Sequence, residues 1–184
     1  MAAGDLTTLE SFRVYCPGAS TADDALLEQL ITAYSAVIKS WLGRDILTDS
    51  YDITKSGRGT FAMQLPEYPI QSVELVQIDG ITIPARAAIG QTGHTFDEEQ
   101  IMLVGYCFTR GAANVRIQFT AGYDAVPADI AQAANELIAL RYKERDRIGH
   151  SSKSLAGETV SFITKDMPAS VATLLKSWRK VAPI

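Results

Sequence analysis

The chain has 184 residues, of which 47% are hydrophobic and 21% charged. This composition is typical of a globular protein and excludes a disordered chain or a fibre. The net charge of −4 argues against tight binding of nucleic acid, which needs a dense basic face.

Helical periodicity dominates the start of the chain. We predict a short helix at residues 8–15, because Pro17 and Gly18 follow it, and a long helix at residues 22–42 that ends at Gly43. Apolar residues of the long helix recur at spacings of three and four. They form one stripe of Leu26, Leu30, Ala33, Val37 and Trp41, widened by Leu27, Ile31, Ile38 and Leu42. We expect Leu30 and Val37 of this helix to lie in the core.

The middle of the chain changes to the period of strands. Short runs rich in β-branched and aromatic residues alternate with turn residues, which predicts strands at 50–54, 60–65, 72–78, 81–83, 101–104 and 115–120. Residues 56–59 and the pair Asp79-Gly80 are typical of hairpin turns. The polar segment 90–100 is predicted to be a loop. Strand 72–78 is expected to place Val73 and Leu75 on one face and Val76 and Ile78 on the other.

Helices return after the strands. Pro127 suits a first helical turn, and Leu137 and Ile138 lie on the apolar stripe of the helix that follows, so both are expected in the core. Residues 149–166 have no helical period and are predicted to be a flexible loop. A last helix is predicted at 168–181. The fold class is therefore α+β: a helical core of two long helices plus short N- and C-terminal helices, with a central β-rich insertion.

A single domain is expected over residues 1–184, helical at 1–44 and 124–184 and β-rich at 45–123. Charge is uneven along it. Residues 1–123 hold 8 basic and 14 acidic side chains, whereas residues 124–184 hold 9 basic and 7 acidic ones. The basic excess at the end suggests that this part meets an acidic partner or a sister subunit.

No catalytic, metal or cofactor site is recognisable. Cys16 and Cys107 have no metal-ligand spacing and are interpreted as free, packed thiols, and His94 and His150 as exposed loop residues. The start of the chain lacks the basic and apolar regions of a secretory signal, which predicts synthesis and folding in the cytoplasm. We therefore expect a protein that assembles with other proteins.

Three segments, taken in order, resemble a known family. They are the acidic pair and long helix from Asp23 to Arg44, the strand, Gly-Tyr turn, Val-Pro pair and Ala-rich helix from Phe119 to Arg145, and the closing segment from Met167 to Arg179. This order and spacing is similar to the head–tail connector family, the head-completion adaptors of tailed phages. The β-rich segment carries little of the resemblance.

The resemblance implies a structural subunit of the virion neck, made in the host cytoplasm, and not an enzyme. It implies a homo-oligomeric ring, a dodecamer, that docks under the portal protein. Such a ring extends the channel through which packaged double-stranded DNA passes without specific binding, and it is the platform for the stopper or tail-completion protein. No cofactor and no membrane contact are implied. The alternatives are another neck or tail ring component, a stopper or tail terminator, and an enzyme with an unrecognised site.

The last helix is the candidate partner-binding surface. Its apolar face and basic flank predict a contact with the portal or with an adjacent subunit, because Trp and Arg often dominate interfaces. The residues assigned to this surface are Leu174, Leu175, Trp178, Arg179 and Lys180. Packing on the protein's own core is the competing interpretation of the same helix.

Overall fold

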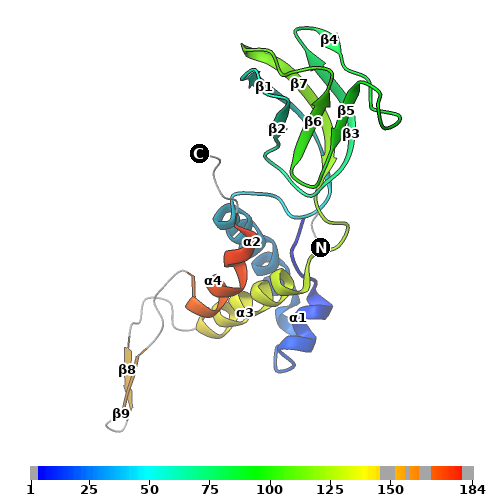
Figure 1. Cartoon of the computed structure of the whole chain (residues 1–184). Coiled ribbons are helices and arrows are strands. Elements are labelled where there is room, and N and C mark those ends of the chain that lie inside the picture. The colour runs from blue at the N-terminus through cyan, green and yellow to red at the C-terminus, as the bar shows by residue number, and fades with distance from the viewer. Residues whose placement is uncertain (1–3, 146–151, 156–157, 162–166, 180–184) are drawn as a thin grey trace. The chain divides into compact units, whose positions relative to one another are not determined.

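The computed structural model describes residues 4–145, 152–155, 158–161 and 167–179. The chain divides into two compact units (Figure 1). One unit, here called the helical unit, combines Met1–Arg44 with Val126–Ile184, and the other, the β unit, is Asp45–Ala125. Within the described residues, no helix is long and apolar enough to cross a membrane.

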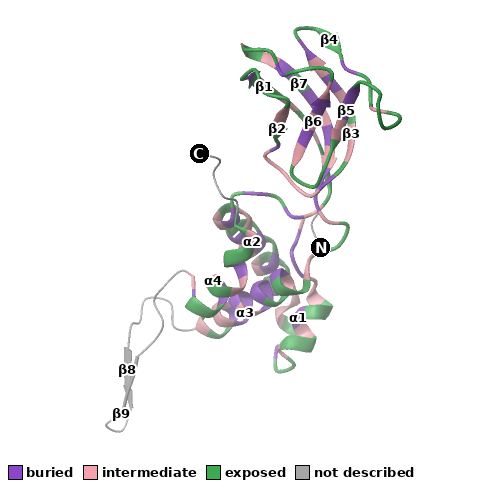
Figure 2. Ribbon diagram, in the orientation of Figure 1, coloured by how far each residue is buried: buried purple, intermediate pink, exposed green. Residues whose placement is uncertain are grey.

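The helical unit is built around one helix, α3 (Ala128–Glu144). The helices α1 (Leu9–Tyr15), α2 (Asp24–Leu42) and α4 (Ala169–Leu175) all pack against it. The short 3-10 helices Thr21–Asp23 and Lys176–Trp178 adjoin α2 and α4. Eight α3 residues are buried, and purple covers much of this helix in Figure 2. They are Ile130, Ala133, Ala134, Asn135, Leu137, Ile138, Ala139 and Tyr142.

The helix ends follow from local chemistry. Thr8 caps α1, where its hydroxyl accepts a hydrogen bond from the Ser11 backbone N–H at 3.0 Å. Gly43 ends α2 with a φ of 71°, a left-handed conformation that glycine adopts without a Cβ clash. Pro127 stands immediately before α3. The predicted positions of these helices are confirmed, but the last helix is shorter than predicted and gives way to a 3-10 turn at Lys176.

The buried stripe of α2 differs from the predicted one. Leu27, Ile31, Ser35, Ile38 and Leu42 face the core, whereas the predicted core residue Val37 is 44% exposed and Leu30 is only partly buried. Two apolar stripes run side by side along this helix, and periodicity alone cannot choose between them. The position of α3 decides, because it buries the stripe that contains the polar Ser35.

Polar side chains inside the helical unit hold the N-terminal segment. The Leu6 backbone N–H donates to the Ser35 hydroxyl at 2.9 Å, and the Thr7 hydroxyl donates to the side-chain amide oxygen of Asn135 at 2.7 Å. Asn135 also donates to the Ser11 hydroxyl at 3.2 Å. A buried polar group costs free energy unless it is hydrogen-bonded, so these bonds permit Ser35 and Asn135 to stand at core positions.

The β unit contains two antiparallel sheets. The four-stranded sheet has the order β1-β7-β3-β4, and the three-stranded sheet has the order β2-β6-β5. Their strands are β1 (Asp49–Gly57), β2 (Ala62–Gln64), β3 (Ile70–Ile78), β4 (Ile81–Thr82), β5 (Gly93–Phe96), β6 (Gln100–Val104) and β7 (Gly111–Ala121). β7 is the central strand and pairs with both β1 and β3. Its partners lie far apart in sequence, so their pairing closes long loops.

The β unit has a hydrophobic core of its own. Twelve buried residues form this cluster: Leu65, Ile70, Val76, Ile78, Ile83, Ile101, Leu103, Phe108, Val115, Ile117, Phe119 and Ala121. The rings of Tyr51 and Phe119 stack at 5.3 Å across β1 and β7. The β unit therefore has a hydrophobic cluster formed entirely by its own residues.

This core corrects the predicted fold class. The α+β class holds, but the prediction of a helical core of two long helices with a central β-rich insertion is wrong. The described residues form four α-helices of 7, 19, 17 and 7 residues beside a β-rich unit with its own core. Helical periodicity reveals which face of a helix is apolar, but it does not show where the main cores of a chain lie.

Of the two hairpin turns predicted from the sequence, the structure contains one. Asp79 and Gly80, with φ values of 51° and 83°, form the predicted two-residue hairpin between Ile78 and Ile81. The predicted hairpin turn at residues 56–59 is wrong, because the strand before it pairs with β7 and the strand after it pairs with β6. The glycines there mark a change of sheet.

The predicted loop at 90–100 contains a strand, β5, and a buried histidine. His94 is 6% exposed, and its Nδ1 lies 3.0 Å from the carbonyl oxygen of Ile83. The prediction of an exposed loop histidine is therefore wrong. β5 has only four residues with little apolar pattern, and its pairing with β6 gives it strand structure.

The predicted flexible loop at 149–166 lies largely outside the described residues, as does His150. Inside this range, β8 (Ser152–Leu155) and β9 (Glu158–Ser161) pair as an antiparallel hairpin. Cys16 and Cys107 are both free, as predicted, but Cys107 is exposed, so the prediction of a packed thiol is wrong at that position.

One buried and one exposed apolar residue of the helical unit can be compared by substitution with alanine. Leu137 of α3 is completely buried, so Leu137→Ala should lower the free energy of unfolding by about 2–5 kcal/mol. Val37→Ala on the exposed face of α2 should change it by about 0.5 kcal/mol or less. Chemical denaturation of both variants measures the difference, and equal losses would contradict the burial of the two faces.

The pairing of β1 with β7 places Asp52 beside Arg116 and Gln118, which predicts how the stability of this pairing depends on pH. Asp52 accepts hydrogen bonds from Arg116 at 3.0 and 2.6 Å and from Gln118 at 2.9 Å, and these bonds lower the pKa of its carboxyl group from 3.8 to about 2. Because the pKa of Asp52 is lower in the folded protein than in the unfolded chain, its ionised carboxylate stabilises the fold fully above about pH 4. This stabilisation is lost as the pH falls through about 2. NMR titration should show the midpoint for Asp52 rising toward 3.8 in Arg116→Ala and unchanged in Arg110→Ala.

Candidate interaction surface

The C-terminal surface of the helical unit is formed by α4 and the 3-10 turn after it. Val171 and Leu175 of α4 are completely buried, and the Ser170 hydroxyl donates a hydrogen bond to the Glu136 carboxylate on α3. These contacts fix α4 on α3. The helix therefore presents a defined outer surface.

The outer surface contains three of the five residues predicted to bind a partner. Leu174 and Trp178 are partly buried, and Arg179 is exposed. The Arg179 guanidinium lies 5.3 Å from the centre of the Trp41 ring, in the last turn of α2. A cation over an indole face is attracted by the ring quadrupole, which holds this charge at one place on the surface.

Of the other two predicted residues, only Leu175 can be placed, and it does not lie on this surface. Leu175 is 0% exposed and packs inside the helical unit, and Lys180 lies outside the described residues. Helical spacing placed Leu174 and Leu175 on one apolar face. The packing of α4 on α3 separates them into an outer and an inner position. Partner binding by this surface stays a prediction.

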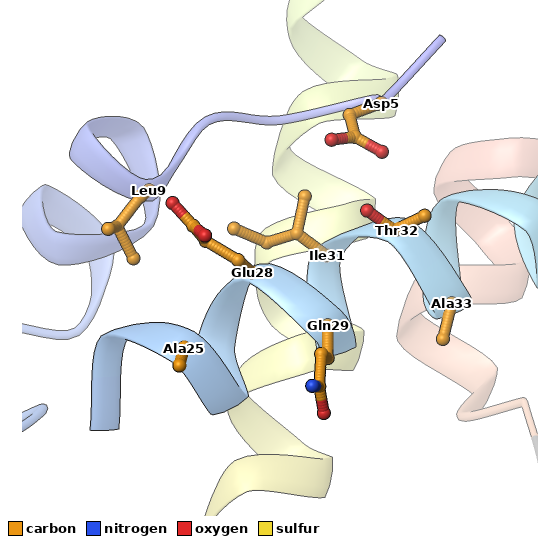
Figure 3. Close-up of a pocket in the computed structure, with 8 residues that line it drawn as sticks. All are labelled: Asp5, Leu9, Ala25, Glu28, Gln29, Ile31, Thr32 and Ala33. Carbon is orange, nitrogen blue, oxygen red and sulfur yellow. The ribbon is translucent and has the colours of Figure 1, made fainter. Parts of the chain in front are cut away.

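A groove lies between α1, α2 and the N-terminal segment (Figure 3). Its volume is about 580 Å³. Leu9 of α1 and Ile31 of α2 contribute apolar side chains, and Glu28 and Asp5 add carboxylates. The remaining lining residues are Ala25, Gln29, Thr32 and Ala33 of α2. Sequence reasoning missed this groove, because it depends on how the N-terminal segment crosses α2.

One polar cluster in the helical unit has a structural role. The Tyr142 hydroxyl donates to the Asp23 carboxylate at 2.5 Å, and this bond, with desolvation, raises the pKa of Tyr142. Arg145 lies 3.5 Å from the same carboxylate and 4.0 Å from the centre of the Tyr142 ring. The cluster joins the end of α3 to the start of α2.

The acidic run at residues 97–99 in the β unit also has a local explanation. The Asp97 carboxylate accepts hydrogen bonds from the backbone N–H groups of Glu99 and Gln100 and from the Gln100 side chain. These bonds lower the pKa of Asp97. Across the described part of the chain, no group of three or more His, Cys, Asp or Glu is placed to hold a metal ion.

Solved structures with the same fold come from gene transfer agent (GTA) particles. "Neck of empty GTA particle computed with C6 symmetry" contains a chain that matches with a TM-score of 0.63 and 22% identity, covering 100% of this chain and 95% of that one. "Neck of native GTA particle computed with C12 symmetry" matches with a TM-score of 0.56 and 19% identity, covering 100% and 98%. A chain of "Virion of native gene transfer agent (GTA) particle" matches with a TM-score of 0.57 and 22% identity, covering 95% and 89%.

The sequence itself matches the family model described as head completion protein over residues 5–181. The chain therefore belongs to the head completion protein family, and it is a structural component of the neck at the head–tail junction. The resemblance to head-completion adaptors is confirmed. No curated protein matches the sequence.

The two sides of α4 should respond differently to substitution. Leu175→Ala removes a completely buried side chain and should lower the free energy of unfolding by about 2–5 kcal/mol. Lys176→Ala, at the next and exposed position, should change it by about 0.5 kcal/mol or less. Thermal and chemical denaturation test this, and wild-type stability of Leu175→Ala would show that α4 does not pack on α3 in solution.

Proposed function

We propose that the chain is one subunit of a homo-oligomeric ring that docks under the portal protein. The ring extends the DNA channel and is the platform for the stopper or tail-completion protein. The family match over residues 5–181 is the observation that carries this proposal. The C6 and C12 symmetries of the solved neighbours support a closed ring, and the C12 neck supports a dodecamer.

The role we propose is structural and not catalytic. The pKa shifts of Asp52, Asp79 and Asp97 are all downward and come from hydrogen bonds that join strands or turns. A general acid near neutral pH needs a carboxyl pKa that is raised by burial or by a like charge. These carboxylates are therefore suited to holding local structure.

The charge of the chain suits a channel through which DNA moves. At a net charge of −4, a ring of many copies repels the phosphate backbone more than it attracts it. We propose that contact with DNA is weak, sensitive to salt and independent of sequence. A conduit with this property does not retain the duplex during packaging or ejection.

The α4 surface is the part of the helical unit that we assign to assembly. Leu174 and Trp178 offer partly exposed apolar area, and Arg179 adds a positive charge fixed over Trp41. Lys180 was assigned to the same surface from the sequence. Aromatic and arginine side chains in such a setting are the types that most often dominate protein interfaces.

Heads that contain portal and DNA but lack this chain test the proposal. Added wild-type protein should attach and stop DNA leakage, and Arg179→Glu should weaken attachment about tenfold or more, because it reverses the charge of the assembly surface. Sedimentation of heads with bound protein measures this. The variant should fold normally, since an exposed cation over a ring contributes only about 0.5–1 kcal/mol.

Lys143→Glu is the matched control, because it makes the same charge change at an exposed position of α3. It should attach as wild type. Failure of the wild-type protein to bind portal-containing heads would contradict the proposed function itself.

A further inference from the structure

The outer face of α2 has the character of a covered surface. Of nine exposed residues in this helix, only Glu28 is charged. The others include three alanines, Leu26 at 37% exposure and Val37 at 44%. Helices that face water usually carry charged residues on their outer side. We call these nine residues the α2 face.

The groove continues this face. Ala25, Gln29 and Ala33 belong to both, and in Figure 3 they lie along the outer side of α2 beside the groove. The groove also contains the Asp5 carboxylate, but Asp5 is only 6% exposed, so Glu28 is the exposed charged residue where the groove meets the helix. The groove and the α2 face therefore adjoin one another, with the Glu28 carboxylate toward the N-terminal end of α2.

Glu28 is the group in this surface that can select a partner by charge. It is exposed, and it forms no hydrogen bond or ion pair within the part of the chain that the structure describes. It lies in the second turn of α2, whereas Arg179 stacks over Trp41 in the last turn. At 1.5 Å per residue, thirteen residues separate the two charges by about 20 Å along the helix, too far for a contact within one copy.

We propose that the groove and the α2 face bind the α4 surface of a second copy of this chain, with Arg179 of that copy facing Glu28. This inference rests on the proposed ring and names the contact between its neighbours. Three properties support the choice of occupant. The two surfaces have opposite charge, both offer apolar area, and they share no residue.

The geometry of a ring requires such a pair of surfaces. A cyclic assembly of more than two subunits needs a heterologous contact, in which one patch of each copy meets a different patch of the next. α1, which contributes Leu9 to the groove, lies on one side of α3 in Figure 1, and α4 lies on the other. A copy that used both surfaces would have one neighbour on each side.

A charge exchange tests this contact in the full chain. Glu28→Lys and Arg179→Glu should each lower the affinity of copies for one another about tenfold or more, because each places like charges opposite one another. The double variant restores an opposite pair at every contact of the ring and should recover assembly to within about threefold of wild type. Glu98→Lys, the same charge change at an exposed position of the β unit, should assemble normally.

The measurement is the number of copies bound per portal-containing head as a function of protein concentration. Wild-type assembly by Glu28→Lys would overturn the inference, and so would a double variant as defective as Arg179→Glu. The second result would mean that the α4 surface binds the portal instead. In both cases the wild-type protein still binds heads, so the proposed function stands. The proposed function would be contradicted only if the wild-type protein did not bind.

Discussion

Burial of α3 decides which surfaces of the helical unit are open to partners. α1, α2 and α4 all pack against this helix, and eight of its residues are buried. A helix enclosed in this way contributes stability but little surface. The outer faces of α1, α2 and α4 are therefore the places where the unit can meet another protein.

Two buried polar residues, Ser35 and Asn135, position the N-terminal segment beside these outer faces. Ser35 and Asn135 are polar residues at buried positions of α2 and α3. They hold Leu6, Thr7 and Ser11 by hydrogen bonds. The bonds hold the N-terminal segment against the unit, and the groove beside α2 is bounded by that segment. Leaving a buried polar group without its hydrogen bond costs free energy, so these bonds keep the N-terminal segment in place. The groove therefore has a fixed wall on that side.

The β unit follows a different principle. Its central strand pairs with partners distant in sequence, and its core is formed only when these strands meet. Bulges in β3 alter its alternation. Between Val73 and Leu75 the register shifts, so that Val73 packs on the same core as Val76 and Ile78 although simple alternation places it on the other face. The long-range contacts that set this register have no local signal.

The sequence by itself determined the positions of the helices, the end of α2 at Gly43, the Asp79-Gly80 hairpin and the family, because these depend on residues near one another in the chain or on their order along it. The tertiary structure alone decided which α2 stripe is buried, that Leu175 is completely buried while Leu174 is only partly so, and that His94 lies in a strand. It also decided that the β-rich segment has a core of its own. Each of these depends on what a residue packs against, and the partners are set by contacts between segments far apart in the sequence.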